Sequence, residues 1–125
     1  MLDAARLLLS HSGPSVPQRR RGACWLARSA LESAVDRLLA DRGIDASRAS
    51  MRVQLICLRA VGGTGETAHV AEHAWAGLST AAHQHAYELA PTVAETAHLI
   101  ALVEEVVSAA TKAPANPAPA GAEAR

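Results

Sequence analysis

Three side chains able to move protons lie within five residues of one another: His83, His85 and Tyr87. They come at the end of an apolar stretch with helical spacing, and Pro91 follows as a helix-stop signal. Histidine suits general acid–base catalysis because its ordinary pKa lies near neutrality. If this chain carries out chemistry, we expect the chemistry at this segment.

The segment His85-Ala86-Tyr87 resembles the His-x-Tyr end of the signature of HEPN domains, small all-α bundles common in bacterial toxin and defence systems. That signature is an arginine, four to six residues, then a histidine, often followed by x-Tyr. The arrangement of predicted helices is similar as well, over roughly residues 20–110. The resemblance implies an all-α bundle that forms a homodimer, with the two motifs in one cleft.

The resemblance also implies a chemistry, that of a metal-independent ribonuclease. His85 would act as general base or acid on the ribose 2′-hydroxyl, and Tyr87 would support it with its hydroxyl. An arginine would steady the phosphate as it becomes more anionic, a role suited to its permanent charge and planar fork. In toxin members paired with a nucleotidyltransferase antitoxin, the tyrosine corresponding to Tyr87 is a place where nucleotides can be attached.

The sequence departs from this pattern at the arginine. The three positions that would hold it carry Leu78, Ser79 and Thr80, and none of them is cationic. Losing a comparable electrostatic group costs about 3–4 kcal/mol, or about two to three orders of magnitude in rate. Another helix could supply the charge through Arg28, Arg52 or Arg59. The candidate catalytic set is therefore His85, His83, Tyr87 and Thr80.

Two functions from different classes follow. The first is a non-catalytic module that binds to itself, to a partner protein from the same operon or to RNA, in a toxin–antitoxin or defence-type system. The second is an RNA-cleaving toxin that uses His85 with His83 and Tyr87. In the first case the two histidines are polar residues at a helix end that bond to neighbouring carbonyls. No cofactor is expected in either case.

Other residues able to bind a metal give a weaker pattern. His69 and His73 are four residues apart, so one helical turn could present both to zinc, but nothing selects a third ligand. Cys24 and Cys57 show neither metal-ligand spacing nor a disulfide framework, so we expect buried free thiols. The sequence therefore predicts no metal site.

Charge is balanced overall but divided along the chain. Residues 1–60 contain ten arginines and five acidic residues, whereas residues 61–125 contain two basic residues and seven glutamates. The two halves could attract each other within the bundle or across a dimer. Alternatively, the arginines could form a nucleic-acid surface for phosphate, built mainly from Arg19, Arg20, Arg21, Arg52 and Arg59.

About half of the 125 residues are apolar and many of these are alanine, which favours an all-α bundle of four to five up-and-down helices. Apolar spacing predicts helices over residues 2–11, 24–42, 66–89 and from 92 onward, and a further helix to about residue 61 capped by Asp45 or Ser47. Gly43 is placed to end one helix in the left-handed conformation, and Thr92 with Glu95 forms a capping box.

These elements predict three parts of the chain. Residues 1–18 are a short N-terminal helix and linker, residues 19–113 form the helical bundle domain, and residues 114–125 are a disordered tail rich in proline and alanine. The N-terminus lacks the features of a signal peptide, and no apolar run approaches the ~20 residues of a membrane helix. We expect a cytoplasmic protein without membrane contact.

Overall fold

A computed structural model of the chain describes residues 2–10, 16–61, 64–82 and 92–112. It contains the helices α1 (Leu2–Ser10), α2 (Val16–Ala40), α3 (Met51–Ala60), α4 (Gly65–Ala82) and α5 (Val93–Lys112). Within these residues there is no strand, so the prediction of an all-α bundle is confirmed.

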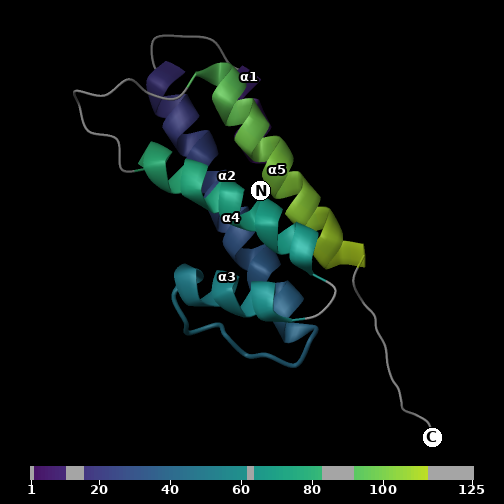
Figure 1. Cartoon of the computed structure of the whole chain (residues 1–125). Coiled ribbons are helices and arrows are strands. Elements are labelled where there is room, and N and C mark those ends of the chain that lie inside the picture. The colour runs from purple at the N-terminus through teal and green to yellow at the C-terminus, as the bar shows by residue number, and fades with distance from the viewer. Residues whose placement is uncertain (1, 11–15, 62–63, 83–91, 113–125) are drawn as a thin grey trace, which may run out of the picture.

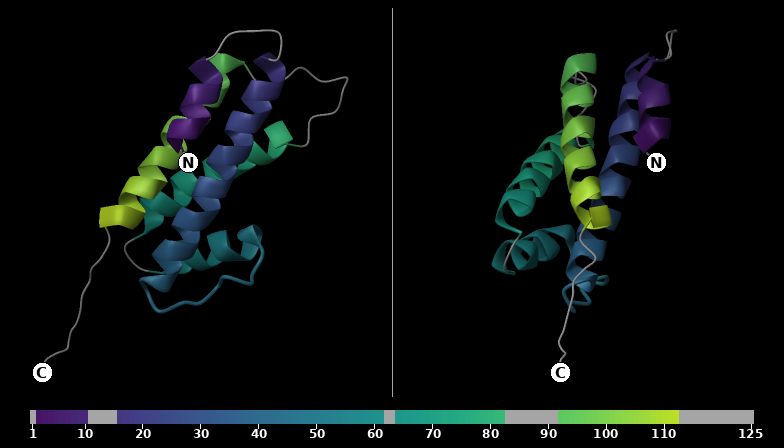
Figure 2. Two further views of the ribbon diagram at one scale, coloured as in Figure 1. Left: turned by 180° about the vertical axis from the view of Figure 1, so that it is seen from behind. Right: turned by 90° about the vertical axis from the view of Figure 1, so that its right-hand side faces the viewer.

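The two longest helices, α2 and α5, pack side by side through the centre of the bundle (Figures 1 and 2). They run in the same direction, because Cys24 is level with Thr96 near one end and Arg37 shares a groove with Thr111 near the other. Helix α1 lies against the first half of α2, α4 packs on both α2 and α5, and α3 crosses near the end of α2. The end of α4 and the start of α5 therefore lie toward the end of the bundle where α2 begins.

The predicted apolar stripes form the core. The apolar positions at helical spacing are buried on both long helices, except Val107, which is half-buried. They are Cys24, Ala27, Leu31, Val35 and Leu38 on α2 and Thr96, Leu99, Ile100, Val103 and Val106 on α5. The fully buried side chains are mostly leucine and valine set among alanines, which lets the helix axes approach closely. The largest are Leu31, Leu38, Leu39, Leu58, Leu78, Ile100, Val35, Val103 and Val106.

Helix α2 is longer at its start than the sequence predicts. It begins at Val16 rather than near Cys24, and it includes Pro17. Proline is tolerated in the first turn of a helix because the amides there have no partner within the helix. The side chain of Trp25 on this helix is 64% exposed and covers no neighbouring helix among the described residues.

The end of α2 is confirmed as a glycine stop. Gly43 has a φ of 79°, its amide donates to the Ala40 carbonyl, and the Ile44 amide donates to the Leu39 carbonyl at 2.9 Å. This pair of bonds defines a Schellman motif, which needs a residue in the left-handed region.

Replacing Gly43 by alanine should lower the free energy of unfolding by about 1 kcal/mol, because an L side chain is strained at a positive φ. Urea unfolding measures the change. The matched control is Gly65→Ala, where an added Cβ meets nothing within 4 Å and φ is not positive. Its stability should stay equal or rise slightly, and equal losses for the two variants would contradict the assignment.

Side-chain caps fix the first turns of α3 and α5. Ser50 caps α3 by accepting a bond from the Val53 amide, whereas Asp45 accepts two bonds from Ser47 in the preceding turn. The prediction of Asp45 or Ser47 as the cap is therefore wrong. The capping box is confirmed: the Thr92 amide donates to Glu95 at 2.7 Å, and the Glu95 amide donates to the Thr92 hydroxyl at 3.0 Å.

Candidate functional site

The segment singled out for chemistry joins α4 to α5, and His83, His85 and Tyr87 lie outside the described residues. Thr80, which takes one of the places of the motif arginine, lies in the last turn of α4. It is exposed, and its hydroxyl donates to the Ala76 carbonyl of its own helix at 3.0 Å. The described part of the site therefore offers a hydroxyl turned back on its helix where the motif needs a positive charge.

A cavity of about 560 Å³ opens between α3 and the second half of α4. Its lining combines arginines, an acid and apolar side chains from the two helices: Arg52, Leu55, Ile56, Arg59, Glu72, Trp75, Ala76 and Ser79. It is the described cavity that approaches Thr80, since Ser79 lines it. It is where another helix could place a cation near the end of α4.

Two of the three arginines considered as replacements for the motif arginine are already engaged. Arg59 forms an ion pair with Glu72. The guanidinium of Arg28 lies over the ring of Trp75, with its central carbon 4.4 Å from the ring centroid, and its Nε is 3.6 Å from a carboxylate oxygen of Glu32. Arg52 is exposed and forms no ion pair with the described residues.

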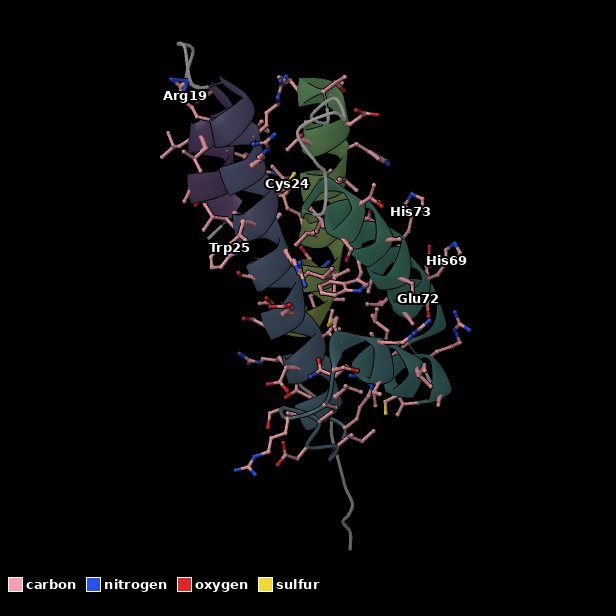
Figure 3. The ribbon with its side chains drawn as sticks, turned by 90° about the vertical axis from the view of Figure 1, so that its left-hand side faces the viewer. Arg19, Cys24, Trp25, His69, Glu72 and His73 are labelled. Carbon is pink, nitrogen blue, oxygen red and sulfur yellow. The ribbon has the colours of Figure 1, made fainter. Side chains whose placement is uncertain are left out.

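The five arginines proposed as one phosphate-binding surface fall into two groups. Arg19, Arg20 and Arg21 lie in the first turns of α2, where Figure 3 labels Arg19. Arg52 and Arg59 lie on α3, which packs near the other end of α2. Since the long axis of α2 separates the two groups, one continuous surface does not include all five.

Arg20 has one guanidinium nitrogen that is shielded from solvent. It lies one turn before the buried Cys24 on the same side of α2, and it is only partly exposed. Its Nε is shielded from solvent and has no hydrogen-bond partner in the described part of the chain. Cys24 is level with Thr96, so Arg20 is level with Thr92, where α5 starts. From the sequence Arg20 is predicted to be a surface cation, and the shielded Nε is not predicted, although the four-residue spacing from the buried Cys24 carries that signal.

The thiol of Cys24 is free and buried between α2 and α5, as predicted. Burial raises the pKa of this thiol, and a hydrogen bond with Thr96 offsets part of the increase. Cys57 is also free but only half-buried, so the expectation of two buried thiols holds for Cys24 alone.

The raised pKa of Cys24 predicts a pH dependence of stability. The folded state holds the thiol proton more tightly than the unfolded state, so this contribution is fully present below the ordinary thiol pKa of about 8.5. It declines as the pH rises from there through the higher folded-state pKa. Urea unfolding at pH 7.5 and at pH 9.5 should show a larger loss for the wild type than for Cys24→Ala. Cys57→Ala, the control, should behave like the wild type.

Histidines of α4 and α5 form a loose group on the surface. His69 and His73 are exposed, and their side chains point outward from α4 (Figure 3). The ring of His98 on α5 lies edge-on to that of His73, with centroids 6.5 Å apart. Among the described residues no three histidines, cysteines or acidic residues come close enough to hold a metal ion.

Ion pairs between helices join the two oppositely charged halves of the chain. Arg6 on α1 pairs with Glu104 on α5, and Arg59 on α3 pairs with Glu72 on α4. Each pair joins the basic first half of the chain to the acidic second half. All four side chains are partly exposed, so each pair contributes at most about 1 kcal/mol to stability.

A larger cavity, about 1110 Å³, is a groove between α2 and α5 beyond the start of α1. Its walls are mainly alanine and serine with scattered charges, among them Arg37, Glu104 and Lys112. It follows the second half of α5, away from Thr92 and from the end of α4. Its size therefore does not link it to the chemistry suggested by the sequence.

Comparison with known proteins adds no relative to this description. The chain matches no protein-family model, no curated protein and no solved structure at a significant level. In the part of the chain that the structure describes, no helix is both long and apolar enough to span a bilayer.

Proposed function

We propose that the chain is a HEPN-like helical bundle that acts as a non-catalytic binding and dimerisation module in a bacterial toxin–antitoxin or defence-type system. Its partner is a protein encoded beside it. Support comes from the His-x-Tyr resemblance, from the all-α bundle, and from the contacts that already hold Arg28 and Arg59.

One observation carries the preference for binding over catalysis: the described end of α4 lacks an arginine poised for a phosphate. Thr80 bonds to its own helix, and Arg28 and Arg59 are held by Trp75, Glu32 and Glu72. Releasing Arg28 or Arg59 for catalysis would break these contacts. Without a fixed cation the anionic transition state loses about two to three orders of magnitude in rate.

A specific observation favours the ribonuclease as the second candidate. Arg52 has no ion pair with the described residues and lines the same cavity as Ser79, one turn before His83. An arginine from α3 therefore lines a cavity that extends to the last turns of α4, the helix that His83, His85 and Tyr87 follow in the sequence.

Incubation of the full chain with tRNA and total RNA in EDTA separates the two functions. We expect no cleavage by the wild type and no growth arrest on expression. Cleavage that disappears in both His85→Ala and Arg52→Ala would overturn the binding proposal in favour of the ribonuclease. Arg48→Ala, which removes an exposed arginine before α3, is the matched control for lost positive charge.

A further inference from the structure

Helix α3 has two apolar faces although it is only 10 residues long. One face holds Met51, Leu55 and Leu58 and is buried in the bundle. The other holds Val53, Ile56 and Ala60, spaced as i, i+3 and i+7, and it is open to solvent. Val53 is 46% exposed and Ile56 is 62% exposed. A helix that only completes a bundle needs one apolar face, so the second face calls for a partner outside the described residues.

The open face of α3 is bordered by positive charge on the side toward α4. Arg52 and Arg59 lie one on each side of Ile56 along this edge, and all three line the 560 Å³ cavity. Glu72 neutralises Arg59 in part, whereas Arg52 has no acidic partner among the described residues. The half-buried Trp75 forms the opposite wall of the cavity. An apolar stripe with a positive edge is complementary to an amphipathic helix that carries acidic residues along one edge.

We propose that the open face of α3, together with Trp75, is the docking surface for an acidic amphipathic helix of a partner protein. The proposal rests on the binding function above and names the place and the chemistry of the partner. The partner's apolar side chains cover Val53 and Ile56, and its carboxylates pair with Arg52 and compete with Glu72 for Arg59.

Two other occupants fit these observations less well. A second copy packed face to face on α3 would bring the arginines of the two copies together around the Ile56 side chains, which is repulsive. Single-stranded RNA would satisfy Arg52 and Arg59 and could contact Trp75. It would leave the aliphatic side chains of Val53 and Ile56 poorly matched, since bases prefer aromatic or guanidinium planes.

A designed peptide tests the proposal on the full chain. The probe is an amphipathic helix of about 18 residues, or about five turns, with leucines along one stripe and glutamates along one edge. A matched probe has lysines in place of the glutamates. Trp25→Phe leaves Trp75 as the sole tryptophan, so that its fluorescence reports on the cavity. We expect saturable binding of the acidic peptide, at least about tenfold tighter than binding of the lysine peptide.

Two variants locate the binding surface. Ile56→Glu should weaken binding of the acidic peptide at least about tenfold. Leu7→Glu places the same change on α1, where the side chain is 59% exposed, and should leave the affinity unchanged. Circular dichroism verifies that both variants remain folded, which is expected because neither side chain is in the core.

Several results would overturn the assignment of this surface. Equal binding of the two peptides, or no effect of Ile56→Glu, removes α3 as the docking site. Tighter binding of an oligouridylate that is lost in Ile56→Glu assigns the face to RNA, and concentration-dependent dimerisation lost in that variant assigns it to a second copy. None of these results bears on catalysis. The RNA-cleavage assay tests the binding function separately, so a failure of that function and a failure of the α3 surface are distinguishable.

Discussion

Thr80→Arg should turn an inactive chain into a ribonuclease, with RNA cleavage in EDTA rising by about two to three orders of magnitude. The substitution creates an arginine followed by four residues, His85 and then x-Tyr, which is the complete HEPN-type signature. Thr80 is exposed, and among the described residues its hydroxyl bonds to the Ala76 carbonyl of its own helix alone, so α4 accommodates a longer side chain there. The guanidinium would supply the fixed positive charge that the transition state lacks.

The controls for this gain of activity separate the motif from a general effect of charge. Thr80→Gln adds length without charge and should remain inactive. The double variant with Thr80→Arg and His85→Ala should lose the gained activity, because the general base is absent. Gel electrophoresis of labelled tRNA measures cleavage in each case. If the Thr80→Arg variant folds and dimerises but stays inactive, the resemblance to HEPN domains extends to the fold and not to the ribonuclease chemistry.

Leu31→Ala should lower the free energy of unfolding by about 2–5 kcal/mol. The Leu31 side chain is fully buried on α2, the helix that contacts each of the other four described helices. Its truncation leaves a cavity among rigid neighbours, since alanine-rich surroundings provide few long side chains to fill it. Urea unfolding followed by circular dichroism measures the loss.

The same substitution on the surface provides the control. Leu7 on α1 is 59% exposed, so Leu7→Ala should change stability by no more than about 0.5 kcal/mol. Comparable losses for the two variants would contradict the core described for α2. A loss at Leu7 alone would mean that the outer face of α1 is covered in solution by another chain.

Much of the fold follows from sequence because its signals are local. The apolar stripes of α2 and α5 have the period of a helix, and their members are buried as expected. Gly43 and the Thr92–Glu95 box depend on contacts within a few residues, so the sequence predicts them correctly. The cap of α3 was missed because three candidates, Asp45, Ser47 and Ser50, all have suitable side chains. Which of the three becomes the cap depends on the shape of the preceding turn. Gln54 holds that turn by donating to the Ala46 and Ala49 carbonyls.

The site is less predictable because it depends on contacts between helices. Nothing in the sequence says that Arg28 covers Trp75 or that Arg59 pairs with Glu72, since 47 and 13 residues separate these partners. In the sequence, the second apolar face of α3 amounts to Val53, Ile56 and Ala60 beside the buried stripe. Its meaning depends on the absence of a covering helix from the described structure, which periodicity does not report.

The same limit applies to the arginines. Five of them were grouped as one surface by type, but only the path of the chain separates Arg19–Arg21 from Arg52 and Arg59. The shielded Nε of Arg20 is a further example, because an arginine taken by type alone is expected to lie fully in solvent.

Co-expression of the chain with the protein encoded beside it is the most direct test of the proposed binding function. Gel filtration should yield a stable complex with the wild type and with Leu7→Glu, and no complex with Ile56→Glu. Wild-type protein that elutes without the neighbouring product, and that cleaves tRNA in a manner dependent on His85, would contradict the account.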